Sequence, residues 1–571
     1  MTQQEIIASL PTHLKPFVGV QDYGQYTPRD HAVWRFLLKH LSDHLQATAH
    51  PVYLEGLART GISLDHIPSI DEMNSCLAQL GWRAVVVDGF VPPAIFMEFQ
   101  ALKILVIALD MRSVDHIEYT PAPDIVHESA GHAPFIVDVD YAEFLQRFGE
   151  VGMKAVSNEQ DQAVYEAIRQ LSIVKECPDS TSKDIAVAEG ELRRANEANV
   201  DLSEASLLSR LHWWTVEYGL VGEVDDYKIF GAGLLSSLGE SKHCLDDDQV
   251  QKVPLTVDAV TCPYDITSVQ PRLFVTKSCR HLSQVLEEFA ATMCFKRGGA
   301  ESLNKAVQAA TICTAQYDSG MQVSGVFDEI LCDAVGNPIY LRTRGPSQLA
   351  WRGSEIYGHG TATHPQGFGS PIGLLKDFSR CLSQYTIDEL RAHDIAIGQH
   401  CRLEFLSGIT VVGELRRIHR QEHRSLILGF EDCTVTDMAG RVLFDPAWGC
   451  YDMAVGASID SVFGGAADRE QLQLYPVSPA ASNLSATDKA ESQLMALYSQ
   501  VSEMRNNMDE QDIPKLMVEL GNYPDEWLLR VEFLNALLDS QVETRSTLER
   551  ELREIQSREP AVAKLIDMAI H

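Results

Sequence analysis

The sequence of 571 residues has few features of a secreted or membrane-spanning protein. Its twelve cysteines are scattered, with no Cys-x-x-Cys pair and no short disulfide framework, which excludes a disulfide-built fold. No apolar run approaches the roughly 20 residues needed to cross a bilayer, and the N-terminus carries no basic and apolar leader. These absences predict a soluble protein of a reducing, cytoplasmic compartment.

Basic residues are scarce beside acidic ones. The chain has 47 Lys and Arg against 80 Asp and Glu, a formal net charge of −33 and a pI near 4.9. Such a field repels nucleic acid and anionic membranes, so neither is expected as a partner. The length, with a hydrophobic fraction of 45%, predicts two to four globular units.

The most informative stretch carries two histidines close together. His127 and His132 lie in the segment YTPAPDIVHESAGHAP, where a short helix is expected from near Asp124 to near Gly131. On an α-helix, residues five apart point roughly 140° apart, whereas the four-residue spacing of zinc protease helices leaves only about 40°. Both rings reach one metal ion only if Gly131 lets the last turn distort.

A third ligand candidate is Glu217, in the segment LHWWTVEYGL. A carboxylate inside an apolar and aromatic segment is costly to bury unless a cation, a metal or a hydrogen-bond donor faces it. Two histidines and one carboxylate, with the other positions open, suit non-haem Fe(II). On spacing alone the alternative stays open that these histidines are ordinary helix-end residues and that Glu217 is a salt-bridge partner.

Three segments in a fixed order resemble the pterin-dependent aromatic amino acid hydroxylases. They are residues 119–132, residues 213–220 and the segment YKIFGAGLLSSLGE at 227–240. The resemblance is greatest to the members that act on phenylalanine, in a long bacterial-type form with an extra C-terminal region. It implies a monooxygenase that uses Fe(II), O₂ and tetrahydrobiopterin or a related tetrahydropterin to convert L-phenylalanine to L-tyrosine.

The same resemblance implies roles for individual residues. The catalytic metal ligands would be His127, His132 and Glu217, and Arg112, held by Asp124, would bind the carboxylate of the amino-acid substrate. Further substrate-binding candidates are Thr120, Trp213, Ser236 and Ser237. Candidates for binding the pterin are Gly89, Val91, Pro93, Phe96 and Glu128. Glu240 would be a hydrogen-bond partner of a metal-bound histidine, and His212 departs from the tyrosine usual in the family.

The rest of the chain predicts three regions. We expect a mainly α catalytic domain of the hydroxylase type over residues 1–310, with a helical insertion at about 152–206. Its first long helix, capped at Thr27, would face the core with one stripe that includes Phe36. A β-rich domain of unknown role would follow over residues 315–475. Its loop histidines His359 and His364 are expected to face solvent.

A C-terminal helical region is expected over residues 487–571. Its apolar faces could dock on the β-rich domain or form a homo-oligomer, and the sequence leaves both open. Other functions also remain open: hydroxylation of tryptophan or tyrosine with the same machinery, a zinc hydrolase, or a ligand-binding protein without catalysis.

Overall fold

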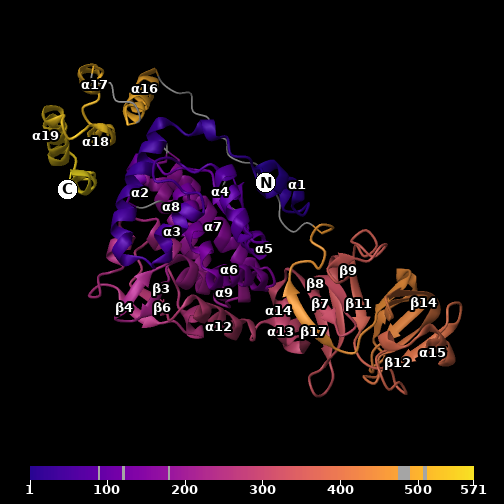
Figure 1. Ribbon diagram of the computed structural model, residues 1–571. Helices are drawn as coiled ribbons and strands as arrows, with labels where there is room; N and C mark the ends of the chain where they lie inside the picture. The colour runs from indigo at the N-terminus through magenta and orange to yellow at the C-terminus, as the bar shows by residue number, and fades with distance from the viewer. Residues whose placement is uncertain (88–90, 119–122, 178–179, 473–488, 506–510, 571) are drawn as a thin grey trace.

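The computed structural model describes residues 1–87, 91–118, 123–177, 180–472, 489–505 and 511–570. Figure 1 shows a helical body formed by the first half of the chain, with a β-rich region at one end and the C-terminal helices at the other. None of the helices in the described ranges is long and apolar enough to cross a membrane. No disulfide joins any of the twelve cysteines, all of which lie in described residues.

The helical body contains helices of very different lengths and two small sheets. Its α-helices are α1 (Gln3–Ser9), α2 (Pro28–Thr48), α3 (Val52–Arg59), α4 (Ile70–Leu77), α5 (Pro93–Ala101), α6 (Val139–Gly152), α7 (Glu159–Glu176), α8 (Ser182–Ala198), α9 (Glu204–His212), α10 (Ala232–Leu235), α11 (Glu240–His243), α12 (Cys279–Ala290), α13 (Cys294–Arg297) and α14 (Gly299–Ala309). Its 3₁₀ turns are η1 (Lys15–Phe17), η2 (Tyr23–Gln25), η3 (Ala78–Leu80), η4 (Val114–His116), η6 (Ala133–Val137) and η8 (Val257–Thr261).

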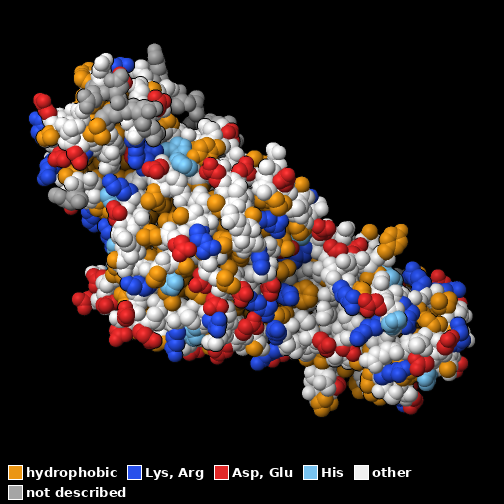
Figure 2. Space-filling model, viewed as in Figure 1, with side chains coloured by type: hydrophobic (Ala, Val, Ile, Leu, Met, Phe, Trp, Pro, Cys, Tyr) orange, Lys and Arg blue, Asp and Glu red, His pale blue; other side chains and the backbone are white. Residues whose placement is uncertain are grey.

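The two sheets are short. Strands β1 (Arg83–Val87) and β2 (Ile104–Ala108) pair in parallel. The other sheet has the order β4-β3-β6-β5, made by β3 (Leu220–Glu223), β4 (Asp226–Ile229), β5 (Gln251–Pro254) and β6 (Arg272–Thr276). Figure 2 shows acidic side chains gathered at the edge where Figure 1 draws β3 and β4. The exposed Glu223, Asp225 and Asp226 of this hairpin carry part of the negative charge of the chain.

Helix α2 begins at the expected cap. The Thr27 side chain accepts from the Asp30 N–H, the Asp30 carboxylate accepts from the Thr27 N–H, and Pro28 takes the first helical position. The core-facing stripe predicted for this helix is buried, and burial extends beyond it to every residue from Ala32 to Leu38. A helix buried on all sides needs a covering layer on its second face.

The C-terminal helices supply that layer. They are α16 (Lys489–Met504), α17 (Ile513–Leu520), α18 (Trp527–Ala536), α19 (Val542–Arg558) and α20 (Ala563–Ile570). The Trp527 ring of α18 meets Phe36 edge to face at 5.2 Å, and Arg35 Nε donates to Glu532 Oε2 at 2.7 Å in a buried ion pair. The C-terminal region thus docks on α2 rather than on the β-rich region, and its core is continuous with that of the helical body.

The β-rich region holds two antiparallel sheets with separate apolar clusters. The first runs β10-β9-β8-β7-β17, with β11 also paired to β9, and the second runs β12-β13-β14-β15, with β16 also paired to β14. The strands are β7 (Ile312–Tyr317), β8 (Met321–Cys332), β9 (Pro338–Trp351), β10 (Ser354–Glu355), β11 (Gly367–Pro371), β12 (His400–Glu404), β13 (Thr410–Gln421), β14 (Arg424–Thr436), β15 (Val442–Phe444), β16 (Tyr451–Ala454) and β17 (Ile459–Gly464). Short helices η9 (Leu382–Gln384), α15 (Ile387–Ala392) and η10 (Pro446–Trp448) connect them.

Charged contacts tie the β-rich region to the helical body. Beyond β17, Arg469 Nη1 lies 2.9 Å from the Glu98 carboxylate of α5, whose other oxygen lies 2.8 Å from His13 Nε2. Ser461 of β17 donates to the backbone carbonyl of Phe295 at 2.9 Å. These contacts fix one end of the β-rich region against the body that carries the candidate site.

Candidate active site

The two histidines of the candidate site are brought together by a π-helix. The segment η5 (Val126–His132) has this wider turn, in which backbone hydrogen bonds join residues five apart. Residues at that spacing therefore lie nearly one above the other, and His127 Nε2 is 3.2 Å from His132 Nε2. On an α-helix the two rings would point away from each other, and the π-helical turn removes this difficulty.

Gly131 allows this helix to pack closely on α10. A Cβ atom at this position would lie 2.8 Å from the backbone oxygen of Ala232, closer than real Cβ atoms approach. Gly131, which is expected to let the last turn distort, thus also allows η5 and α10 to approach each other closely.

Glu217 completes a triangle of donor atoms. It ends a second π-helix, η7 (Trp213–Glu217), after which the Tyr218 N–H donates back to the carbonyl of Trp213 at 2.9 Å. One carboxylate oxygen of Glu217 is 3.3 Å from His127 Nε2, and the other is 3.3 Å from His132 Nε2. The three groups singled out from the sequence therefore converge on one point.

Electrostatics distinguish Glu217 from the neighbouring Glu128. Burial alone would raise the pKa of Glu217, but the rings of His132 and His127 hold that pKa well below its usual value. Burial raises the pKa of Glu128 to about 8, against the opposing influence of His132. Glu128 also lies farther away, at 3.9 Å from His132 Nε2. Glu217 is thus the ionised carboxylate of the cluster, and Glu128 is a neutral acid beside it.

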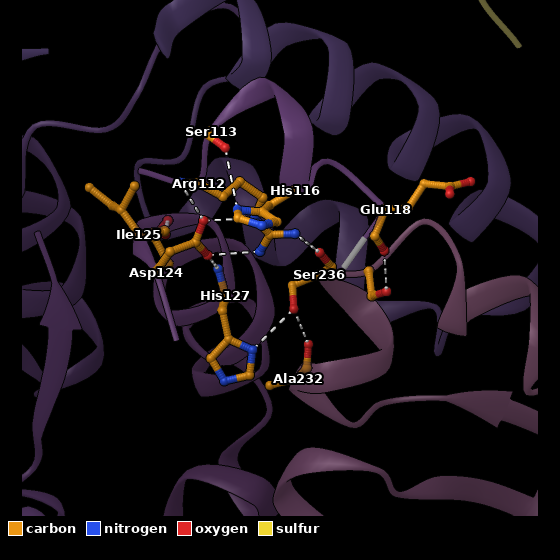
Figure 3. A network of polar contacts seen from close by, with 11 residues as sticks. Arg112, Ser113, His116, Glu118, Asp124, Ile125, His127, Ala232 and Ser236 are labelled. Carbon is orange, nitrogen blue, oxygen red and sulfur yellow. Dashed lines mark hydrogen bonds and ion pairs between the residues drawn. The ribbon is translucent and has the colours of Figure 1, made fainter. Parts of the chain in front are cut away.

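Ser236 fixes which nitrogen of His127 carries its proton. Its hydroxyl donates to the carbonyl of Ala232 at 2.8 Å, and its oxygen lies 3.1 Å from His127 Nδ1 (Figure 3). Because the only hydroxyl hydrogen goes to Ala232, the oxygen is left to accept from Nδ1–H. The lone pair of His127 is then on Nε2, which faces His132 and Glu217.

Arg112 and Asp124 form a buried, two-pronged ion pair in the same network (Figure 3). Arg112 Nε and Nη2 each donate to a different oxygen of Asp124 at 2.7 Å. Burial would raise the pKa of Asp124, but the guanidinium and the hydrogen bonds of Arg112 lower it below its usual range. Arg112 Nη1 also donates to the backbone oxygen of Ser236 at 3.0 Å, which links this pair to the residue that orients His127.

Aromatic side chains surround the cluster on other sides. Trp213 is stacked between Tyr218, at 4.6 Å, and Tyr264, at 4.4 Å between ring centroids. Trp213 is predicted from its segment, whereas no local pattern singles out the two tyrosines. Tyr218 follows Glu217 directly, so a place near the site could be inferred for it from the sequence. Tyr264 comes from a distant loop, and its contact with Trp213 depends on the fold.

His212, the departure from the family pattern, lies directly beside the cluster. Its Nδ1 is 3.7 Å from Glu217 Oε1, and its ring meets Phe96 edge to face at 6.1 Å. Burial lowers the pKa of His212 to about 4, and its buried Nε2 has no hydrogen-bond partner among the described residues. His212 therefore contacts both Phe96 and the carboxylate of the cluster.

The remaining predicted site residues lie at different places, and two of them are outside the described residues. Gly89 and Thr120 lie outside the described residues. Val91 packs on the small apolar cluster under β1 and β2, and Pro93 is the first residue of α5, the helix that carries Phe96. Ser237 donates to the backbone oxygen of Glu118 at 3.1 Å.

Glu240 does not contact a histidine of the cluster as predicted. Its carboxylate accepts from the Tyr218 hydroxyl at 2.5 Å, and burial raises its pKa to about 7, against the opposing effect of that bond. Ser236 holds the expected position beside His127 instead. Glu240 reaches the cluster only through Tyr218, the residue after Glu217.

The chain matches a known family over its helical body. The family model of biopterin-dependent aromatic amino acid hydroxylases matches residues 12–174 and 196–317. The unmatched stretch between them falls on the end of α7 and most of α8, and most of the β-rich region and all of the C-terminal helices lie beyond the match.

Curated relatives agree with this family. Phenylalanine-4-hydroxylase of Pseudomonas aeruginosa is 28% identical over 264 residues, which cover 46% of this chain and 84% of that protein. Phenylalanine-4-hydroxylase of Ralstonia nicotianae is 29% identical over 272 residues, 47% of this chain and 73% of that protein. A solved structure of Chromobacterium violaceum phenylalanine hydroxylase with iron(III) and 7,8-dihydrobiopterin aligns at 25% identity and a TM-score of 0.39, covering 51% of this chain and 90% of that one.

The family match covers the residues that build the cluster. It includes η5, η7 and the Arg112–Asp124 pair, and the relatives match over most of their own length. Through residues 12–317, the chain belongs to the biopterin-dependent aromatic amino acid hydroxylases.

Proposed function

We propose that the helical body hydroxylates L-phenylalanine to L-tyrosine, using Fe(II), a tetrahydropterin and O₂ at the cluster of His127, His132 and Glu217. The observation that carries this proposal is the convergence of two imidazole nitrogens and one ionised carboxylate within 3.2–3.3 Å of one another. The curated relatives that share this part of the chain are phenylalanine hydroxylases.

The donor atoms fit a single divalent transition metal ion. Metal bonds of about 2.1 Å, at angles between those of octahedral and tetrahedral geometry, separate neighbouring donor atoms by roughly 3.0–3.4 Å. Two histidines and one carboxylate on one side leave further positions open, the arrangement typical of Fe(II) sites that react with oxygen. When bound, Fe(II) and the tetrahydropterin would supply the activation of O₂, which protein side chains cannot perform.

Arg112 would hold the substrate's carboxylate. Its guanidinium has five N–H donors, of which the described contacts use three: two toward Asp124 and one toward the Ser236 carbonyl. Two donors remain, one on each terminal nitrogen, and these would be offered to the substrate's carboxylate. Because Asp124 fixes the guanidinium, this group loses little freedom when a substrate binds. Thr120, Ser236 and Ser237 remain candidates for the polar part of the same pocket.

The edge of Trp213 would form one wall for the substrate's ring, because Tyr218 and Tyr264 cover both faces of the indole. Trp213 starts the π-helix that ends in Glu217, so one rigid turn carries both the wall and a metal ligand. Stacking on Tyr218 and Tyr264 holds the indole plane in one orientation. A fixed wall positions the ring and excludes water from the space above the metal ligands.

The pterin would lie on the side of α5. Phe96 would stack on its ring, and Val91 and Pro93 would line the approach; the role predicted for Gly89 falls outside the described residues. Glu128, whose pKa of about 8 keeps it protonated at neutral pH, can donate a hydrogen bond that an ionised carboxylate cannot.

A substrate panel tests the proposal. The purified full-length chain, with Fe(II), tetrahydrobiopterin and O₂, is offered phenylalanine, tyrosine and tryptophan separately, and each product is identified by mass spectrometry. We expect tyrosine from phenylalanine, with kcat/KM at least tenfold above that for the other two. Preferred turnover of tryptophan or tyrosine would overturn the substrate, and no hydroxylation of any of the three would overturn the proposed activity.

A further inference from the structure

A second cluster of two histidines and one carboxylate lies in the β-rich region, beyond the residues that match the family. His359 and His364 come from the loop between β10 and β11, and Asp452 comes from β16. His359 Nδ1 is 3.4 Å from His364 Nε2, and Asp452 Oδ2 is 3.6 Å from the former and 3.9 Å from the latter. The side chains are only 10%, 10% and 5% exposed, so the expectation that these histidines face solvent is wrong.

Hydrogen bonding does not account for this convergence. The distances of 3.6 and 3.9 Å from the histidines to Asp452 exceed those of protein hydrogen bonds, and 3.4 Å between the two rings is at the long limit. Two imidazole nitrogens and one carboxylate oxygen therefore face one another without a good mutual bond. Four-coordinate zinc with bonds of 2.0–2.1 Å separates its ligand atoms by about 3.3–3.4 Å. A small inward movement of Asp452 would bring all three atoms to that separation.

The backbone holds the two histidines in place. The carbonyl of His359 accepts from the Leu349 N–H, and the carbonyl of His364 accepts from the Ser347 N–H, both at 2.9 Å. Both donors belong to β9, so the loop is fastened to the first sheet directly beside each imidazole. Asp452 pairs with Gly429 of β14 in the second sheet. The cluster thus joins side chains from both sheets on rigid elements.

Arg417 and Gly429 orient the carboxylate. Arg417 Nη2 lies 3.3 Å from Asp452 Oδ1, which leaves Oδ2 directed at the two histidines. A Cβ atom at Gly429 would lie 2.9 Å from Arg417 Nε and 3.1 Å from Asp452 Oδ1, so the glycine makes room for this contact.

We propose that His359 Nδ1, His364 Nε2 and Asp452 Oδ2 bind a Zn²⁺ ion or a similar late first-row divalent cation. The ligand set is nitrogen-rich with one carboxylate, which suits zinc and disfavours Ca²⁺ and Mg²⁺. Three protein ligands leave a fourth position for water or an incoming ligand, as in zinc sites that are not purely structural. This centre is independent of the hydroxylase cluster and makes the chain a protein with two metal sites.

Zinc binding is measured on the full-length chain in a His127→Ala, Glu217→Gln background, where the first cluster keeps only one imidazole. After chelator treatment and dialysis, calorimetric titration with Zn²⁺ is expected to give one site per chain. Adding His364→Ala should weaken zinc binding by more than about 100-fold. This exceeds the loss produced by changing a residue that only hydrogen-bonds to a metal ligand. His419→Ala is the matched control, because this ring lies 6.2 Å from His359 but is not a ligand, and binding should be unchanged.

Two further measurements keep the proposal testable if His364→Ala fails to fold. Asp452→Asn preserves shape and removes only the charge, and it should also lose zinc while keeping the wild-type circular dichroism spectrum. In the unaltered chain, Co²⁺ titration should show two equivalents with separate visible absorption bands. Zinc binding that is unchanged in Asp452→Asn, a single cobalt equivalent, or a background chain that binds no zinc would each overturn the second site.

Discussion

One carboxylate oxygen of Asp124 accepts from the backbone N–H of His127 at 3.0 Å and from Arg112 Nη2 at 2.7 Å. Arg112 reaches the Ser236 carbonyl, and the Ser236 hydroxyl reaches the His127 ring, so four residues close a loop of hydrogen bonds. The proposed anchor for the substrate's carboxylate and a proposed metal ligand are therefore parts of one rigid unit. A substrate bound at Arg112 would be placed at a fixed distance from the metal site.

Replacing Arg112 by Lys should affect substrate binding and leave the metal in place. A lysine keeps the charge but loses the two-pronged geometry, so KM for phenylalanine should rise about 10- to 100-fold, the equivalent of one strong charged hydrogen bond. Steady-state kinetics and iron content of the same preparations measure both effects. Equal loss of iron and of substrate affinity would mean that Arg112 only supports the structure.

Ser236→Ala should weaken iron binding by about 10- to 100-fold, because His127 loses the acceptor that fixes its proton on Nδ1. Ser236→Thr, which keeps the hydroxyl, should restore most of the affinity, and Ser237→Ala is the neighbouring control. Competition with a fluorescent chelator gives the three affinities. If alanine and threonine at position 236 behave alike, the hydroxyl does not set the tautomer.

Glu240 should make the stability of the chain depend on pH. Its pKa is raised by burial from 4.5 to about 7, so its contribution to stability is complete below about pH 4.5 and is lost as the pH rises through 7. Wild type should therefore lose about 2–3 kcal/mol of stability from this group between pH 5 and pH 9, whereas Glu240→Gln should not. Melting temperatures of both proteins across this pH range measure the loss. If the difference in melting temperature between wild type and Glu240→Gln did not change with pH, the prediction would be contradicted.

The buried pair between Arg35 and Glu532 should couple the C-terminal helices to the body. Removing one partner, as in Glu532→Leu, leaves an unpaired buried charge and should cost about 3–5 kcal/mol, whereas the double change Arg35→Met with Glu532→Leu should recover most of it. Urea unfolding of the three variants measures this. A double variant no better than the single one would show that α18 does not dock on α2 in solution.

Local sequence patterns could predict which residues form the site better than how these residues are arranged in space. The histidines, Glu217, Arg112 and Asp124 stand in recognisable segments, and the cap at Thr27 follows from its local sequence. The π-helical turns could not be predicted from α-helical periodicity, although they alone explain how residues five apart face one point. The hydrogen bond between Glu240 and the Tyr218 hydroxyl could not be predicted in place of one to a histidine, because sequence order does not reveal it.

Contacts between distant segments account for the other differences. The apolar stripe expected on α2 is buried, and the other face of the helix is also covered, by helices from the far end of the chain. His359 and His364 read as ordinary loop residues because their third partner, Asp452, comes from a strand in the other sheet. Burial of this kind depends on tertiary packing, which a local pattern does not contain.

The central claim is that Glu217, and not its neighbour Glu128, completes the metal site of the hydroxylase. Iron content and tetrahydropterin-dependent tyrosine formation are measured together for wild type, Glu217→Gln and Glu128→Gln. We expect Glu217→Gln to lose both iron and turnover, while Glu128→Gln keeps its iron and its fold. Iron retained by Glu217→Gln with wild-type turnover, or lost only in Glu128→Gln, would contradict it.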